Sequence, residues 1–262
     1  MITSRRNGLL KSLKRSSRCK DGQALLEGPH LVGEAVDRGL PLDPVLATPE
    51  FLASDDGRAL LPRLPRHPLE ISSTLLDEVT DTDSPRGIVA GVALPRPGVD
   101  GLPQVEGGIY VYVAGLQDPG NLGALARVAE ASGAAGLALG PGTVHPNHPR
   151  ALRASAGSLL RLPVARHVEA DALETHLQAL TPRWAALATR GGHDLYAPWP
   201  PGTWVLLLGA EGPGLPDALE RRADLRLTIP LEPPVESLNA TAAAAVVLFE
   251  LRRQRSPVKS LG

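Results

Sequence analysis

A nearly continuous apolar run, "IYVYVAGL" at residues 109–116, constrains the fold more than any other stretch of the chain. A strand with one face in water alternates apolar and polar side chains, whereas a strand covered on both faces is apolar throughout. A helical pattern follows at residues 121–133, with Asn121 in the N-cap position and Gly133 as a stop. Short strands and helices alternate in this way up to a closing helix, expected from about Leu238. The alternation predicts an α/β fold with a parallel, doubly wound sheet.

The chain divides at residues 96–107, a segment rich in proline and glycine that shows no periodicity. Such a segment is typical of a linker. Short apolar runs alternate with helical patterns over residues 18–95, which predicts a smaller α/β domain. The larger predicted domain covers residues 108–255. We expect residues 1–17 to be a basic extension and residues 256–262 to be a tail.

The net charge of −1 hides two basic stretches that contain no acidic residue. The first, residues 1–20, carries seven lysines and arginines. The second, residues 145–167, is expected to contain one helix at residues 148–162. Its arginines are Arg150, Arg153, Arg161 and Arg166. These charges are compatible with an ordinary solubilising surface, and they also fit a face that binds a polyanion.

The chain has one cysteine, Cys19, which excludes an internal disulfide and a cysteine-rich metal site. A lone cysteine suits a reducing compartment. The pair Arg5-Arg6 precedes no apolar export segment, because basic residues soon interrupt the run. No stretch approaches the roughly 18 apolar residues needed to cross a bilayer. We therefore expect a soluble, cytoplasmic protein.

Three loops leave apolar strands and combine glycine or proline with polar side chains. In a doubly wound sheet, such loops line the ligand site beyond the carboxyl ends of the strands. The loops are residues 115–127 ("GLQDPGNLGALAR"), 208–215 ("LGAEGPGL") and 229–239 ("IPLEPPVESLN"). Glycine allows a ligand to approach the backbone closely. Each loop alone is a weak indication of a site.

Residue spacing excludes several other kinds of site. The glycine loops do not fit the dinucleotide fingerprint G-x-G-x-x-G, and the chain has neither a G-x-x-x-x-G-K-[ST] phosphate loop nor a G-x-S-x-G nucleophile elbow. His145, Asn147 and His148 lack the spacing of metal ligands, so we expect no metal. Arg127 lies three residues before Glu130, which leaves an ordinary exposed ion pair as an alternative to a functional role for Arg127.

Taken together and in this order, the three loops resemble the three signature motifs of the SpoU (TrmH-type) RNA ribose 2′-O-methyltransferases of the SPOUT superfamily. The motifs are "DPGNLGALARVAEASG", "LLLGAEGPGL" and "IPLEPPVESLNATAAAAVVLFE". In addition, "LLEGPHLVGEAVDRG" and "DTDSPRGIVAGV" are similar to the auxiliary L30e-like RNA-binding domain that often precedes this catalytic domain. The resemblance covers residues 18–252, and three motifs in order are highly specific.

The resemblance implies an L30e-like substrate-binding domain at residues 18–95, followed by a parallel α/β SPOUT domain whose C-terminal part is threaded into a deep trefoil knot. It further implies a homodimer with the active site near the subunit interface. The knot would form the pocket for S-adenosyl-L-methionine. The family's cofactor contacts, which are mainly main-chain contacts, fall on Leu208, Gly209, Ala210, Ile229, Leu231 and Leu238.

The family transfers a methyl group to a ribose 2′-hydroxyl, which is a poor nucleophile and must be deprotonated or strongly polarised. The resemblance assigns this activation to Arg127. Because a guanidinium is almost always protonated, we expect Arg127 to hold the phosphate and to stabilise the developing alkoxide. Asn121 would position the substrate and Arg127, and Glu211, Ser237 and Asn239 would complete the polar wall of the site.

The implied substrate is RNA, whose backbone would be bound by Arg150, Arg153 and Arg161. Members with an L30e-like module most often modify large-subunit ribosomal RNA, and we therefore favour 23S rRNA. A tRNA substrate is one alternative. A non-catalytic RNA-binding or assembly factor that keeps the fold is another, and the intact motif residues argue against it.

Overall fold

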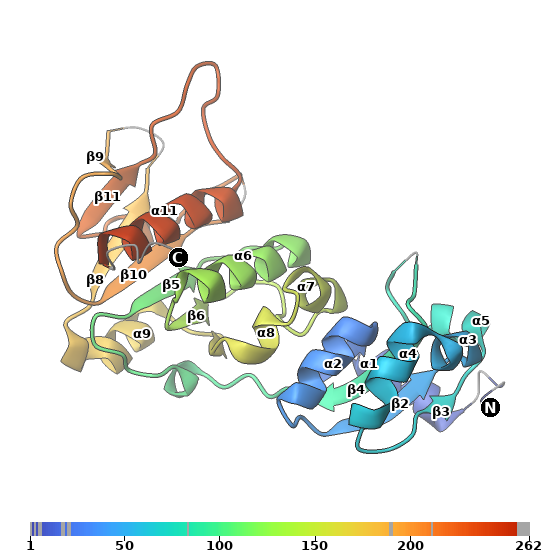
Figure 1. Cartoon of the computed structure of the whole chain (residues 1–262). Coiled ribbons are helices and arrows are strands. Elements are labelled where there is room, and N and C mark those ends of the chain that lie inside the picture. Colours follow the sequence, from blue (N-terminus) through green and yellow to red (C-terminus); the bar gives the residue numbers. More distant parts are fainter. Residues whose placement is uncertain are drawn as a thin grey trace, which may run out of the picture. The chain divides into compact units, whose positions relative to one another are not determined.

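The chain folds into two compact units, which the computed structural model describes at residues 2, 4, 7–16, 19, 22–82, 84–188, 191–210 and 212–255 (Figure 1). The first unit consists of residues 1–95 together with residues 145–160, and the second of residues 96–144 together with residues 161–262. Residues 145–160 therefore pack with the first unit, although their place in the chain suggested the larger domain. Within the described ranges, no helix has both the length and the apolar composition that crossing a bilayer requires.

The first unit is built on a four-stranded mixed sheet in the order β1-β4-β2-β3. β4 runs antiparallel to β1 and β2, whereas β2 and β3 are parallel. The strands are β1 (Gln23–Glu27), β2 (Leu42–Ala47), β3 (Leu69–Glu70) and β4 (Ile88–Ala93). The helices are α1 (Gly8–Ser16), α2 (Pro29–Asp37), α3 (Pro49–Ala53), α4 (Asp55–Leu60), α5 (Ser73–Asp77) and α7 (Pro149–Ala154), with a 3₁₀ turn at Leu61–Arg63.

The helix α1 is part of the core of the first unit, whereas residues 1–17 were expected to form an extension. Leu10 and Leu13 of α1 are buried in one cluster with Leu25 of β1 and Val89 of β4. The two leucines are three residues apart, and this spacing places them on the same face of the helix. The apolar face thus holds α1 on the sheet, and its basic residues lie on the remaining surface.

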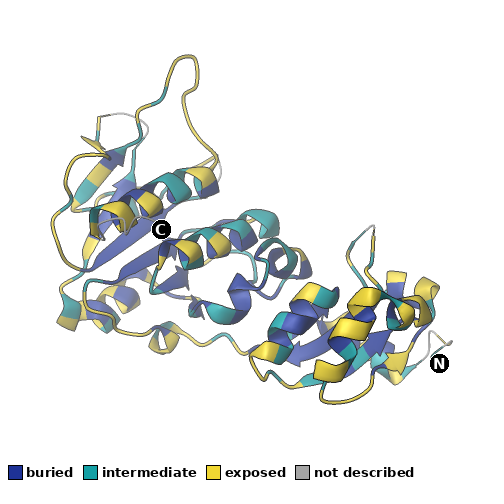
Figure 2. Cartoon of the chain, in the orientation of Figure 1, coloured by how far each residue is buried: buried dark blue, intermediate teal, exposed yellow. Residues whose placement is uncertain are grey.

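The second unit is built on a seven-stranded sheet in the order β7-β6-β5-β10-β8-β11-β9, and every pair of neighbours is parallel. The strands are β5 (Ile109–Val113), β6 (Gly136–Leu139), β7 (Val164–Arg166), β8 (Arg183–Leu187), β9 (His193–Asp194), β10 (Trp204–Leu208) and β11 (Leu225–Thr228). All five residues of β5 and of β10 are buried, and these central strands are dark in Figure 2. The prediction of a parallel α/β sheet is confirmed.

The helices of the second unit follow its strands, as the alternation in the sequence predicts. They are α6 (Pro119–Ser132), α9 (Ala170–Leu177), α10 (Asp217–Glu220) and α11 (Ala240–Arg255), with 3₁₀ turns at Val99–Gly101 and Gln178–Leu180. A further short helix, α8 (Ser158–Arg161), ends at a residue of this unit. α6 and α11 pack against each other. The trefoil knot that the resemblance implies stays a prediction.

Two of the expected helices differ in detail from the structure. The N-cap of α6 is Asp118, whose side chain accepts a hydrogen bond from the backbone N–H of Asn121 at 2.8 Å, so the assignment of Asn121 as the cap is wrong. Gly133 ends α6 in the left-handed conformation, as expected. The single helix expected at residues 148–162 is broken into α7 and α8, because Ala156 and Gly157 between them adopt positive φ angles.

Candidate active site

A cavity lies beside the carboxyl ends of β8, β10 and β11 in the second unit, where a doubly wound sheet binds its ligands. Its lining includes residues from the second loop (208–215), the third loop (229–239) and the first turn of α11. The cavity is lined by Leu187, Ala188, Leu207, Leu208, Gly209, Ala210, Gly214, Leu215, Ile229, Leu231, Glu236, Ser237, Leu238, Ala240 and Ala243. All six predicted cofactor contacts and Ser237 are among these residues, so the structure brings them together at one place.

The lining of this cavity includes a tight turn that requires glycine at position 209. Directly after β10, a Cβ atom on Gly209 would lie 2.3 Å from the backbone carbon of Gly214. The turn is closed by two main-chain hydrogen bonds between Ala210 and Gly214, at 3.1 and 3.0 Å. A side chain at position 209 would force the two backbone segments apart, since backbone atoms cannot move aside as a flexible side chain can. Glu211, a predicted site residue within this turn, lies outside the described residues.

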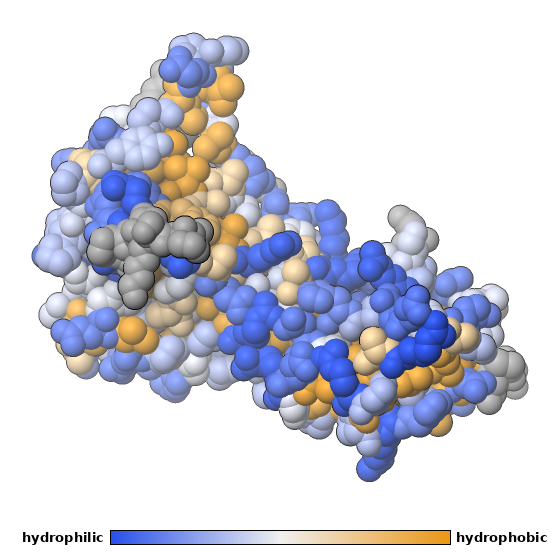
Figure 3. All heavy atoms as spheres, viewed as in Figure 1, coloured by the Kyte–Doolittle hydropathy of each residue, from blue (hydrophilic) through white to orange (hydrophobic). Residues whose placement is uncertain are grey.

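The third loop, residues 229–239, contributes a further part of the lining and is largely exposed. Ile229 and Leu231 are half-buried at the cavity, whereas Val235 and Leu238 are 54% and 38% exposed. Phe249 on α11 is another exposed apolar residue, and Figure 3 shows apolar residues gathered over this part of the second unit. Exposed apolar side chains that gather in this way are typical of a binding surface.

The start of α11 is fixed by Asn239 and Thr241. The side-chain oxygen of Asn239 accepts hydrogen bonds from the backbone N–H groups of Thr241 and Ala242, at 2.9 and 3.3 Å, and so caps the helix. The hydroxyl of Thr241 donates to the main-chain oxygen of Asn121 at 3.2 Å. The predicted site residues Asn121 and Asn239 are thereby held at the adjoining ends of α6 and α11.

Arg127 lies farther along α6 and is exposed. It has no hydrogen bond or ion pair with any residue that the structure describes, so the alternative of an ordinary pair with Glu130 does not occur. The carboxylate of Glu130 instead binds Arg161, with Nε to Oε1 at 2.7 Å and Nη2 to Oε2 at 2.9 Å. Neither Arg127 nor Asn121 is among the residues that line the cavity.

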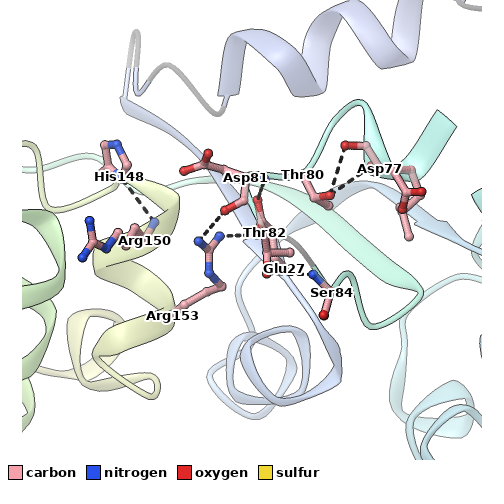
Figure 4. Close-up of polar contacts among 10 residues, drawn as sticks. Glu27, Asp77, Thr80, Asp81, Thr82, Ser84, His148, Arg150 and Arg153 are labelled. Carbon is pink, nitrogen blue, oxygen red and sulfur yellow. Dashed lines mark hydrogen bonds and ion pairs between the residues drawn. The ribbon is translucent and has the colours of Figure 1, made fainter. Parts of the chain in front are cut away.

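The three arginines predicted to bind RNA have different surroundings. Arg161 is held by Glu130 in the second unit. Arg153, on α7, forms an ion pair with the buried Glu27 and donates to the main-chain oxygen of Asp81 at 2.6 Å (Figure 4). Arg150 is exposed on α7. RNA binding by these residues stays a prediction, and two of them also have a structural role within their own unit.

The pair between Glu27 and Arg153 was not anticipated from the sequence. Glu27 ends β1, and one of its oxygens accepts from the backbone N–H of Asp81 at 3.0 Å while the other meets Arg153. Burial raises the pKa of Glu27 above its usual value, against the opposing effects of the Asp81 N–H and the Arg153 charge. The only sequence signal was a glutamate at the end of an apolar strand, and its partner is 126 positions away. Local patterns cannot reveal such a partner.

Comparison with known proteins agrees with this architecture. The SpoU rRNA Methylase family matches residues 108–249, more than half of the chain, and the MRM3-like substrate binding domain matches residues 9–90. The chain belongs to the SpoU rRNA methylase family. The class that the fold and the site define is therefore that of a SpoU methyltransferase with an amino-terminal substrate-binding domain.

Individual relatives match over nearly the whole chain. The 23S rRNA (guanosine(2553)-2′-O)-methyltransferase RlmP of Bacillus subtilis is 30% identical, and the match covers 96% of this chain and 98% of RlmP. The 23S rRNA (uridine(2479)-2′-O)-methyltransferase of Streptomyces viridochromogenes is 30% identical over 92% of this chain and 86% of its own. The crystal structure of AviRb from that organism, in complex with AdoMet, superposes with a TM-score of 0.87 at 27% identity and covers 95% of this chain and 98% of its own.

Proposed function

We propose that this protein is an S-adenosyl-L-methionine-dependent RNA 2′-O-ribose methyltransferase whose substrate is 23S rRNA. The observation that carries the proposal is the cavity at the strand ends, where the second and third motifs of the family meet. Two proteins that match nearly the whole chain are named as 23S rRNA 2′-O-methyltransferases. A similar solved structure contains the cofactor.

The residues of the cavity fit S-adenosyl-L-methionine. Leu208, Ile229, Leu231 and Leu238 give it apolar walls, which suit the adenine ring and the carbon chain of the cofactor. The main chain around Gly209 and Ala210 can supply hydrogen bonds to the polar edges. Glu236 brings a carboxylate to the same lining, and a negative charge is favourable near a ligand with a sulfonium and an ammonium group. When bound, the cofactor supplies an electrophilic methyl group.

The chain's own part in the reaction is to align and polarise the ribose. Arg127, an exposed cation without a partner among the described residues, would bind the phosphate next to the reacting ribose. Its positive charge would stabilise the oxygen of the 2′-hydroxyl as negative charge develops there. Ser237, at the cavity, would hydrogen-bond to the ribose. Asn121, Asn239 and Glu211 would position the substrate beside Arg127.

We also propose that the protein is a homodimer with its active site near the subunit interface. Arg127 is exposed on the second unit but does not line the cavity of the same chain. Exposed apolar side chains of the third loop and α11, Val235, Leu238 and Phe249, offer an area that a second copy would cover. Sedimentation equilibrium tests this point: a dimer at micromolar concentration is expected, and a monomer would refute it.

Methyl transfer to defined RNA tests the proposed function. Unmethylated 23S rRNA and tRNA would each be incubated with the protein and labelled cofactor, and the modified position mapped by its resistance to alkaline cleavage. We expect label in 23S rRNA, at a single 2′-oxygen. Label in tRNA alone would assign the other substrate class, and label in neither RNA would favour a non-catalytic role.

A further inference from the structure

Glu130 lies on α6 within reach of two arginines, and the structure pairs it with only one of them. Arg127 precedes Glu130 by three residues, which places the two side chains about 60° apart around the helix and about 4.5 Å apart along it. Oppositely charged residues at this spacing on a helix ordinarily attract each other. In the structure, however, Arg127 makes no ion pair with Glu130, and Arg161 at the end of α8 binds the carboxylate.

The geometry of the ion pair explains why the carboxylate of Glu130 binds Arg161 and not Arg127. Nε and Nη2 of Arg161 donate to Oε1 and Oε2 of Glu130 at 2.7 and 2.9 Å, so that both carboxylate oxygens are engaged at once. Such a two-point pairing is the strongest arrangement of a guanidinium with a carboxylate. The two side chains are 30% and 29% exposed, and water therefore screens them less than it would screen a pair at the surface of α6.

We propose that Arg161 is a positioning residue that holds Glu130 and so keeps the guanidinium of Arg127 available for the RNA. Without Arg161, the carboxylate of Glu130 is released next to Arg127 and neutralises the cation that polarises the ribose. This inference rests on the proposed function only for the role of Arg127 in catalysis. It assigns Arg161 an effect through Glu130 in place of direct contact with the RNA backbone.

The decisive variants are Arg161→Gln, alone and combined with Glu130→Gln. If Arg161 acts by holding Glu130, Arg161→Gln lowers kcat for methyl transfer roughly tenfold with little change in KM, and the double variant recovers to within about threefold of the wild type. Equal loss in both variants would overturn the proposal, because it would show that Arg161 acts by itself. Unchanged activity of Arg161→Gln would overturn it as well.

The control is Arg222→Gln in the same unit. Arg222 has a similar exposure, 23%, and also pairs with carboxylates, those of Asp171 and Glu174. This variant tests the loss of a paired cation as such, and we expect its kcat to stay within about twofold of the wild type. If Arg161→Gln does not fold, Arg161→Lys takes its place, because lysine keeps the charge but cannot form the two-point pair. We then expect an intermediate loss of kcat, which the additional substitution Glu130→Gln restores.

A second readout needs neither RNA nor activity. The Nε–Hε signal of Arg127, identified by its disappearance in Arg127→Lys, reports by NMR whether rotation of the guanidinium is hindered by an ion pair. We expect free rotation in the wild type, slowed rotation in Arg161→Gln and free rotation again in the double variant. Identical behaviour of Arg127 in all three would contradict the proposal, even if the wild type failed to methylate 23S rRNA and the proposed function were wrong.

Discussion

The hydroxyl of Thr241 donates a hydrogen bond to the main-chain oxygen of Asn121 at 3.2 Å, and this contact joins residues 120 positions apart in the chain. Asn121 is in the first turn of α6, and Thr241 is in the first turn of α11, two residues after the capping residue Asn239. The first and third motifs of the family thus meet at one point. Their functional side chains depend on the helix ends that this contact holds together.

Removal of the Thr241 hydroxyl should therefore destabilise the second unit and disturb the site. Thr241→Val leaves the partly buried main-chain oxygen of Asn121 without this donor, and we expect a loss of about 1 kcal/mol in the free energy of unfolding, measured in urea. Thr175→Val is the matched control, because the hydroxyl of Thr175 bonds only within its own exposed helix turn. An equal effect of the two substitutions would contradict the importance of the contact.

Gly209→Ala should impair cofactor binding. The added methyl group would meet backbone atoms of Gly214 and Leu215, which line the same cavity, and would push the turn open. We expect the affinity for S-adenosyl-L-methionine, measured by calorimetry, to fall at least about tenfold, as an overpacked site costs 1–3 kcal/mol or so. Gly98→Ala has open space and should bind as the wild type does. Normal affinity of Gly209→Ala would argue against the assigned pocket.

Asn239 can be tested separately as a helix cap and as a site residue. Asn239→Ala removes the acceptor for the N–H groups of Thr241 and Ala242, and should cost about 1 kcal/mol of stability. Asn239→Ser keeps a capping oxygen and should retain most of the stability. If the amide also contacts the substrate, methyl transfer falls in both variants. Full activity of Asn239→Ser would limit the role of Asn239 to the cap.

Glu27 should give the first unit a distinctive pH dependence. Burial raises its folded-state pKa above the unfolded value, so the folded protein binds this proton more tightly. The stabilising contribution is therefore complete below the unfolded pKa and is lost as the pH rises through the folded pKa. Relative to Glu27→Gln, which does not titrate at this position, the wild type should lose stability as the pH rises above the ordinary glutamate pKa of 4.5, measured by denaturant unfolding at several pH values. If the difference in unfolding free energy between the wild type and Glu27→Gln stays the same at every pH, the raised pKa of Glu27 is contradicted.

Local sequence patterns were sufficient to predict part of this architecture. The apolar run at residues 109–116 predicts a strand covered on both faces, and β5 is fully buried at the centre of a parallel sheet. Gly133 was expected to end a helix and does so, because the left-handed conformation it adopts favours glycine. These features depend on residues that are close together in the chain, and for that reason a periodic pattern could indicate them.

Features that depend on distant residues were not predictable in this way. The segment 145–160 packs with the first unit, partly through Arg153 and Glu27, and nothing in its own composition indicates that partner. The binding of Glu130 by Arg161 depends likewise on tertiary structure, since the sequence spacing favoured Arg127. The three motifs suggested which residues form the cavity, but that suggestion came from the family resemblance and not from their periodicity.

Methyl transfer by Arg127→Ala tests the central claim most directly. The wild type and the variant would be compared in transfer from S-adenosyl-L-methionine to unmethylated 23S rRNA, with cofactor affinity measured on the same samples. Because Arg127 does not line the cavity, we predict an unchanged affinity and a loss of transfer of at least about a hundredfold. Transfer by the variant within a few-fold of the wild-type rate would contradict the account of the site.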